Sequence, residues 1–198
     1  MIYVMDKYSN YAELEAHERE GIDFEVIVLE QKKSLAAIIA PYAGGIEPKT
    51  GLIARSIALT DYSLYCFRGL KSKHNPVLHI ASHRFDEPRC LNLIANHKRV
   101  ISIHGCDVEG ERVFLGGLDN SLIDILLSEL RRVGIIVEPS DPKYSGTHPN
   151  NICNRGQTKR GVQFELSIQF RMGTQLPLFV KAVRKVLHGL NTTDKLSD

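Results

Sequence analysis

Three side chains that can take part in acid, base or metal chemistry lie at or near the ends of apolar segments. Glu47 follows a short apolar run across a glycine-containing loop, His104 ends a second run, and Glu165 lies in a third. The apolar runs have the length of strands, and loops at the carboxyl ends of strands form the ligand sites of open α/β sheets. Carboxylates and imidazoles bind metal ions and transfer protons. These positions therefore predict a ligand site at one edge of a sheet.

Each of these side chains also has a simpler interpretation. A single histidine at a strand end is more often a hydrogen-bonded structural residue than a ligand, which applies to His104. Glu165 alternates with the apolar Phe164 and Leu166, as on a half-exposed strand with a solvated polar face. The glycines before Glu47 lack the GK[ST] ending of a P-loop and the GxGxxG fingerprint. The local patterns leave the structural and the catalytic interpretations open.

The elements that must position these residues alternate between strands and helices. This alternation favours an α/β fold in which helices flank a mixed, mostly parallel sheet. We expect one domain over residues 1–190 and a flexible polar tail over 191–198. The first two strands, joined by a turn-like segment, suggest a hairpin. The expected strands are 24–29, 35–40, 62–67, 77–82, 100–104, 113–115, 135–137 and 161–168, and the main helices are 10–19, 49–59, 121–133 and 176–187.

The composition limits the classes of function. The 198 residues are 43% hydrophobic and 24% charged, which suits one globular core. A net charge of +2 argues against a nucleic-acid-binding protein. No segment has the length of a membrane span or the form of a secretion signal, so we expect a cytoplasmic protein. The four cysteines form no CxxC pair, and we expect reduced, buried thiols.

Seven segments, in order between Phe24 and Arg171, carry a closer resemblance. Together they resemble the poly-γ-glutamate hydrolase family, which includes phage-related and Bacillus-type proteins. The resemblance implies a fold similar to that of zinc carboxypeptidases and a zinc-dependent hydrolase that cleaves the γ-glutamyl amide bonds of poly-γ-glutamate or a related anionic peptide. The segments are APYAGGIEPKTGLIARSIA, DYSLYCFRGLK, LHIASHRFDEP, VISIHG, FLGGLD, THPNNICNRG and GVQFELSIQFR.

The resemblance also implies roles for particular residues. Glu47 and His104 match two zinc ligands of the family, and Glu165 matches the general base that would act on a zinc-activated water. Tyr42 stands where the family has its third ligand, a histidine. Three outcomes are open: Tyr42 binds zinc as a phenolate, His83 replaces it, or the site is metal-poor and catalytically weak. The last outcome gives the alternative function, a non-catalytic member that binds an anionic polymer or a protein partner.

A γ-linked glutamate polymer carries a free α-carboxylate on every residue, so its binding site needs fixed cations. Arginine is suited to this role because its guanidinium group binds a carboxylate with two parallel hydrogen bonds. We expect Arg84, Arg155 and Arg171 to bind substrate.

Overall fold

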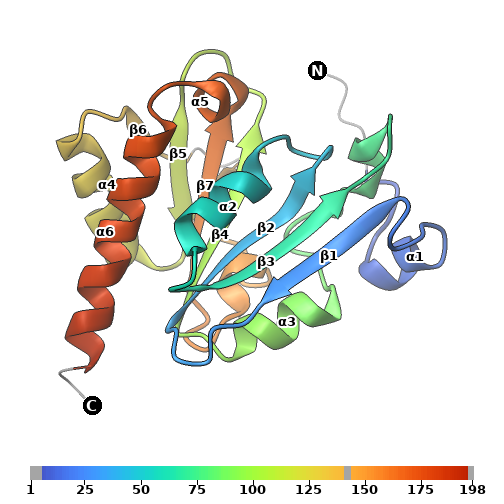
Figure 1. Cartoon of the computed structure of the whole chain (residues 1–198), viewed down its shortest axis with the longest axis horizontal. Helices are drawn as coiled ribbons and strands as arrows, with labels where there is room; N and C mark the ends of the chain where they lie inside the picture. The colour runs from blue at the N-terminus through green and yellow to red at the C-terminus, as the bar shows by residue number, and fades with distance from the viewer. Residues whose placement is uncertain (1–5, 141–143, 196–198) are drawn as a thin grey trace.

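The computed structural model describes residues 6–140 and 144–195, and these form a seven-stranded sheet with helices on both faces (Figure 1). In chain order the elements are α1 (Tyr11–Glu15), β1 (Phe24–Leu29), β2 (Ala36–Gly44), α2 (Thr50–Ala58), β3 (Ser63–Gly69), the 3-10 helix η1 (Asn75–Leu78), α3 (Pro88–Ala95), β4 (Arg99–Cys106), β5 (Val113–Gly117), α4 (Asn120–Arg132), β6 (Val137–Pro139), η3 (Ile152–Arg155), β7 (Val162–Ser167), α5 (Ile168–Met172) and α6 (Leu176–Lys195).

The strand order is β1-β3-β2-β4-β7-β5-β6. The four central strands, β3, β2, β4 and β7, run parallel to one another. β1 is antiparallel to β3 and β5 is antiparallel to β7, whereas β6 is parallel to β5. The prediction of a mixed, mostly parallel sheet is therefore confirmed, and the carboxyl ends of β2, β4 and β7 meet at one edge.

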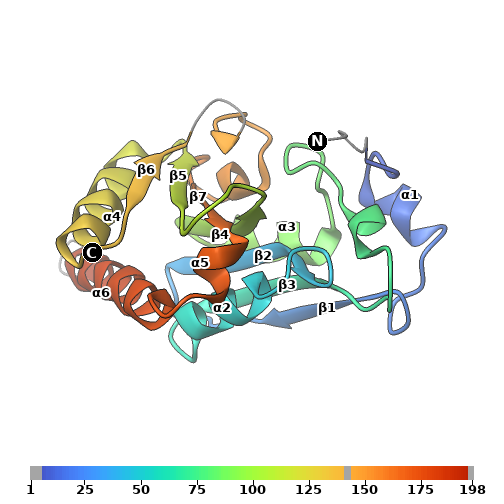
Figure 2. The ribbon, with the colours of Figure 1, turned by 90° about the horizontal axis from the view of Figure 1, so that it is seen from above.

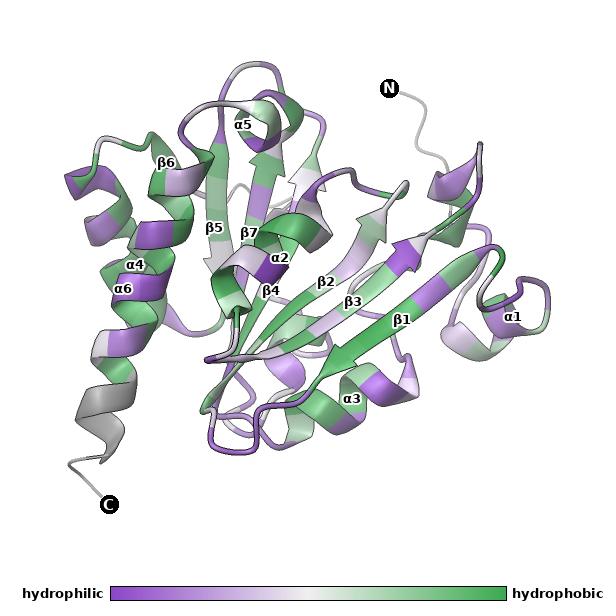
Figure 3. Ribbon diagram, viewed as in Figure 1, coloured by the Kyte–Doolittle hydropathy of each residue, from purple (hydrophilic) through white to green (hydrophobic). Residues whose placement is uncertain are grey.

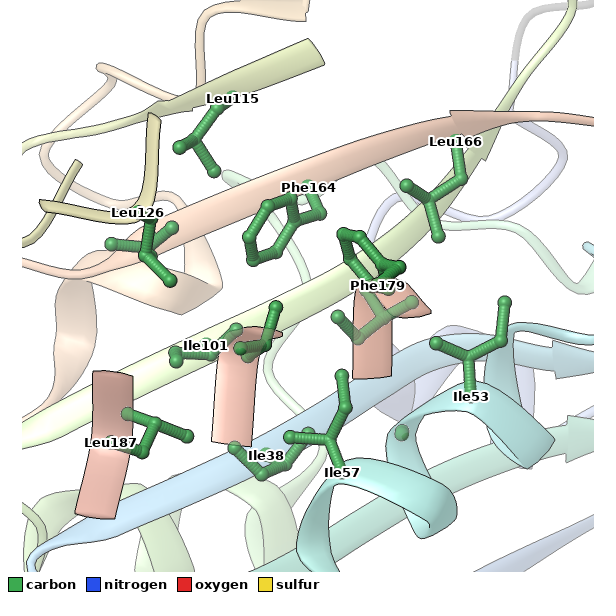
Figure 4. Close-up of a cluster of buried hydrophobic side chains, with 14 of the residues drawn as sticks. Ile38, Ile53, Ile57, Ile101, Leu115, Leu126, Phe164, Leu166, Phe179 and Leu187 are labelled. Atoms are coloured by element: carbon green, nitrogen blue, oxygen red, sulfur yellow. The ribbon is translucent and has the colours of Figure 1, made fainter. Parts of the chain in front are cut away.

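Two hydrophobic clusters hold helices against the opposite faces of the sheet. Figure 2 shows α2, α4 and α6 on one side and α3 on the other. Side chains from β2, β4, β7, α2 and α6 converge in the larger cluster, where Phe164 and Phe179 meet edge to face at 5.1 Å between ring centroids (Figure 4). The alternating hydrophobic and hydrophilic bands of α4 and α6 in Figure 3 match this one-sided burial.

Local sequence explains where the helices begin. The Asp119 side chain accepts a hydrogen bond from the Leu122 amide at the start of α4, and Glu87 caps the Cys90 amide at the start of α3. Pro88 occupies the first turn of α3, where its missing N–H group costs no helical hydrogen bond.

Two local expectations are wrong. The segments 24–29 and 35–40 form no hairpin, because β1 pairs with β3 instead. The expected strand 77–82 is also absent: η1 is followed by an irregular segment whose polar groups bind side chains rather than a neighbouring strand. The Ala81 amide donates to Asp6, and the Ile80 carbonyl accepts from Tyr42.

The remaining expectations concern the thiols, the membrane and the end of the chain. All four cysteines are buried and free, as predicted. Within the described ranges, no helix is long and apolar enough to cross a membrane. α6 continues to Lys195, beyond the predicted helix end at residue 187. Residues 196–198 of the predicted tail lie outside the described part of the chain.

Candidate active site

The sheet brings Tyr42, His104 and Glu165 to one face near the carboxyl ends of their strands. His104 of β4 lies opposite Glu165 of β7 in the parallel register. Their neighbours Ile103 and Phe164 belong to the larger core, so His104 and Glu165 point to the other face because side chains alternate along strands. Tyr42 belongs to the cluster on that second face, and its ring lies 5.1 Å from that of His104.

Glu47 reaches the same place from the loop between β2 and α2. The loop starts at Gly44, which has a φ of 69° and packs so closely on β3 that an added Cβ would lie 2.4 Å from the Gly69 carbonyl oxygen. The Glu47 amide then donates to the Tyr42 carbonyl oxygen at 2.7 Å. These constraints fix the direction in which the Glu47 side chain leaves the loop.

The Glu47 carboxylate accepts a hydrogen bond from the Gly105 amide at 2.7 Å, which places it beside His104. Burial raises the pKa of Glu47 to about 8, and it outweighs the Gly105 hydrogen bond and the positive charge of Arg171, which both lower it. A cation beside Glu47 would restore its ionised form.

His104 is a neutral imidazole that is held by a neighbouring hydroxyl. Its side chain is 1% exposed, and Nε2 lies 2.6 Å from the Ser102 hydroxyl oxygen. Burial, together with the nearby His79, lowers the pKa of His104 to about 3. A histidine that binds a metal through one nitrogen usually has its other nitrogen fixed by a hydrogen bond, so the Ser102 contact leaves Nδ1 for a ligand.

Tyr42 is locked into the protein core. Its hydroxyl donates to the Ile80 carbonyl oxygen at 2.6 Å and lies 3.0 Å from the Ser82 hydroxyl, which can donate in turn. Burial raises the pKa of Tyr42 well above its ordinary value of 10, although the Ser82 hydrogen bond lowers it. The phenol is therefore neutral, and both of its hydrogen-bonding directions are occupied.

The metal-binding expectation fits only two of these residues. Glu47 offers a desolvated carboxylate and His104 offers a neutral imidazole nitrogen, which are donors that zinc prefers. Tyr42 does not fit, because its phenol is neutral and already bonded. Among residues 6–140 and 144–195, no group of three or more His, Cys, Asp and Glu side chains could hold a metal ion. His83 therefore does not join Glu47 and His104 in such a group, and its ring packs against His148 at 5.0 Å.

Glu165 lies beside the histidine in a polar layer of β7. It is 7% exposed, and its Oε1 accepts a hydrogen bond from Gln163 at 2.9 Å. Gln163 is itself held by the side chain of Asn151 and the carbonyl of Tyr144. The predicted alternative, a solvated polar face, is thus wrong for this strand, since β7 is buried along its whole length.

Arg171 joins α5 to the loop that carries Glu47. The side chain is 6% exposed and donates to the carbonyl oxygens of Leu166 and Pro48. An added Cβ at Gly105 would lie 2.6 Å from the Arg171 guanidinium carbon. Arg171 supports the site through backbone contacts, and the predicted role in substrate binding stays a prediction.

Of the other two arginines, Arg84 lies in a turn and Arg155 ends η3. Arg84 is exposed and forms an ion pair with Asp6, with 3.0 Å between Nη2 and Oδ2. Arg155 is half-buried and donates to the Phe85 carbonyl oxygen at 3.1 Å. Their predicted binding of substrate carboxylates also stays a prediction.

A carboxylate and histidine pair beside the site escaped the sequence analysis. His79 Nδ1 lies 2.6 Å from Asp6 Oδ1, and the His79 ring packs on Tyr42 with 4.2 Å between centroids. His79 lies in segment 77–82, which was wrongly expected to be a strand, and Asp6 is far from it in the sequence. No local signal joins the two residues.

Comparison with protein families places the chain among known sequences. The model of a family described as poly-gamma-glutamate hydrolase matches residues 8–189. The chain is 39% identical over 172 residues to the UPF0714 protein YndL of Bacillus subtilis (strain 168), which covers 86% of this chain and 67% of that relative.

Solved structures agree with this match. A bacteriophage poly-gamma-glutamate hydrolase superposes with a TM-score of 0.90 at 28% identity and covers 96% of this chain and 100% of its own. The zinc-free apo form of YNDL superposes with a TM-score of 0.86 at 33% identity, and the match covers 93% of this chain and 98% of that one.

A more distant likeness concerns the fold alone. N-formylglutamate amidohydrolase from Ralstonia eutropha JMP134 superposes with a TM-score of 0.57 at 9% identity, covering 89% of this chain and 99% of that one. The fold is accordingly the single α/β domain of carboxypeptidase-like type that was expected.

Proposed function

The chain belongs to the poly-gamma-glutamate hydrolase family, and we propose that it hydrolyses γ-glutamyl amide bonds of poly-γ-glutamate or a related anionic peptide. The observation that carries this proposal is the pairing of His104 with Glu165 across β4 and β7, beside the Glu47 carboxylate on the Gly105 amide. A base and two candidate metal donors thus meet at the sheet edge where α/β folds bind ligands.

Each residue has a proposed role in the reaction. Glu165 takes a proton from the attacking water and delivers it to the leaving amine as the C–N bond breaks. The Gln163 hydrogen bond to Oε1 orients the Glu165 carboxylate for this transfer. Arg171 holds the Glu47 loop against α5 and β7.

Zinc is the proposed metal, and Glu47 and His104 would hold it. The relative YNDL supports this choice, since its apo form is described as zinc-free. When bound, zinc would polarise the scissile carbonyl and lower the pKa of water to about 7.

One observation favours a second candidate function. The Tyr42 hydroxyl is committed to Ile80 and Ser82, so the position of the third family ligand supplies no metal donor. A two-donor site would bind zinc more weakly than a three-donor site. In the second candidate, the chain is a non-catalytic family member that binds the anionic polymer or a protein partner.

The two candidates are separated by zinc content and turnover measured on the same sample. Tag-free protein purified without chelator would be analysed by inductively coupled plasma mass spectrometry and then incubated with poly-γ-glutamate, with release of new amino groups as the readout. The hydrolase proposal expects about one zinc per chain and turnover that Glu165→Gln removes. Polymer binding without turnover, even with added zinc, would refute hydrolysis and favour the second candidate.

A further inference from the structure

A cavity lies next to the Glu47 loop, on the face of the sheet that α2 covers. Its volume is about 350 Å³, and its wall includes three cationic side chains, Lys49, Arg55 and Arg68. Tyr42 and His104 project to the opposite face. The cavity is therefore separate from the candidate active site.

Of the three cationic side chains, only Arg68 has an anionic partner among the described residues. Arg68 forms an ion pair with Glu25 at 2.5 Å, which offsets most of its charge. The described residues provide no hydrogen-bond or ion-pair partner for the side chains of Lys49 and Arg55, and both residues are exposed. The wall thus carries net positive charge.

Lys49 holds a backbone conformation that lysine rarely adopts. Its φ is 78°, in the left-handed region, where glycine would sit without steric strain. A non-glycine residue in such a region is strained, and strain of this kind gathers at functional sites. Lys49 lines the cavity from this strained position.

The cavity also has an apolar part that is open to solvent. Leu52 is 60% exposed and Met172 is 57% exposed, and both line the wall. A ligand with several carboxylates joined by short methylene chains would match this combination, because the cations would bind the carboxylates and the apolar side chains would cover the methylenes.

The cavity lies beside the loop that carries Glu47, although it opens on the other face of the sheet. Pro48 lines the cavity, while its carbonyl oxygen accepts a hydrogen bond from Arg171. Met172 of the wall directly follows Arg171, and Lys49 follows Glu47 by two residues. A polymer chain that leaves the site over the Glu47 loop would reach the cavity next.

We propose that this cavity is an auxiliary binding site for a γ-glutamyl chain, in which Lys49 and Arg55 bind α-carboxylates of polymer residues remote from the scissile bond. The inference rests on the proposed function, since it takes the same polymer as its ligand. It applies equally to a hydrolase and to a non-catalytic binding protein. Its consequence is a preference for long oligomers over short ones.

The test compares two double variants that remove the same charge. Lys49→Gln/Arg55→Gln removes two positive charges from the cavity. Lys32→Gln/Lys33→Gln, in the exposed turn before β2, removes the same charge elsewhere and is the matched control. Binding of γ-glutamyl oligomers of three and of twelve residues would be measured by isothermal titration calorimetry. We expect the cavity variant to bind the longer oligomer about tenfold more weakly, as the loss of two exposed ion pairs implies. The trimer and the control should behave as the unaltered chain does.

The outcomes that overturn the proposal differ from those that overturn the function. Unchanged binding of the longer oligomer by the cavity variant would refute the auxiliary site alone. No binding of either oligomer by the unaltered chain would refute the proposed function and this inference together. Binding of tripolyphosphate that depends on Lys49 and Arg55, without any effect on the oligomer, would assign the cavity to a phosphate anion instead.

A single substitution separates charge from folding. Lys49→Gly removes the ammonium group and also the strain at a positive φ. We expect an equal or higher melting temperature together with weaker binding of the longer oligomer. A stable variant with full affinity would contradict the role of Lys49.

Discussion

The hydroxyl group of Tyr42 donates a hydrogen bond to the carbonyl oxygen of Ile80, 2.6 Å away, inside the protein core. The family resemblance predicts a metal-binding histidine at this position. The tyrosine instead ties β2 to the irregular segment after η1, and its ring separates His79 from His104. A position expected to bind metal is therefore part of the packing between β2 and the irregular segment after η1.

Restoring the imidazole should strengthen metal binding. Tyr42→His would place a third donor beside Glu47 and His104, and we expect zinc affinity to rise by at least about tenfold, or roughly 1.4 kcal/mol. Competition with a chromogenic chelator measures this gain. No gain would mean that the pocket cannot bring the new imidazole to the other two donors.

Removing only the phenolic oxygen should cost stability without helping metal binding. Tyr42→Phe leaves the buried Ile80 carbonyl without its partner, which should lower the free energy of unfolding by about 1–3 kcal/mol. Urea denaturation checks the stability, and the chelator assay should give the zinc affinity of the unaltered chain. Undiminished stability would contradict the importance of the Tyr42 contact with Ile80.

Glu165 and the two metal donors should respond differently to substitution. Glu165→Gln should keep zinc and lower turnover by about 10²–10⁴-fold, since general acid and base catalysis contributes that much. Glu47→Gln and His104→Ala should lose zinc and turnover together. Zinc content and amino-group release would be measured on each variant, and retained turnover in Glu165→Gln would disprove the general-base role.

In metal-free protein, Glu47 and His104 should change the free energy of unfolding in opposite directions as the pH rises. The pKa of Glu47 is raised from 4.5 to about 8, so over this range the folded protein holds a proton that the unfolded chain releases. The free energy of unfolding therefore falls as pH rises toward 8. The pKa of His104 is lowered from 6.5 to about 3, so its contribution is lost as pH falls from 6.5.

Between pH 6.5 and 8, Glu47 is the one of these two groups that titrates. Glu47→Gln should flatten the decline in stability over that window, as measured by urea unfolding in the presence of a chelator. An equally steep decline in the variant would show that other groups cause it.

The close contact between Gly105 and Arg171 gives a further prediction. Gly105→Ala would bring a methyl group to within 2.6 Å of the guanidinium carbon, so Arg171 must move. We expect a cost of about 1–3 kcal/mol, as for other substitutions that overfill a packed core. Gly189→Ala is the control, since nothing lies within 4 Å of an added Cβ there. Thermal unfolding of both variants tests the difference.

The sequence predicts those parts of the fold that local patterns govern. The strands at Phe24–Leu29 and Val162–Ser167 agree with short segments rich in apolar residues, and α4 agrees with a helical period of apolar residues. Strand pairing depends on distant contacts. The hairpin expected between β1 and β2 is therefore absent, since β3 lies between these two strands in the sheet.

The candidate site likewise contains some residues that the sequence predicts and some contacts that it does not. The positions of Glu47, His104 and Glu165 at strand ends could be expected from apolar runs and from the family resemblance. The Asp6 contact with His79 could not, because it joins the start of the chain to an irregular segment that looked like a strand. The bonding of Tyr42 also depends on that segment, so its loss as a metal donor is visible only in three dimensions.

The place of β7 in the sheet has a consequence for synthesis on the ribosome. β7 lies between β4 and β5, although β5 precedes it in the chain. Until residues 162–167 have been translated, β4 has an open edge and β5 has no partner on the side that β7 will occupy. The nascent chain therefore carries an unpaired, largely apolar strand edge from Cys106, where β4 ends, to Val162, where β7 begins. An edge of this kind recruits chaperones or neighbouring copies.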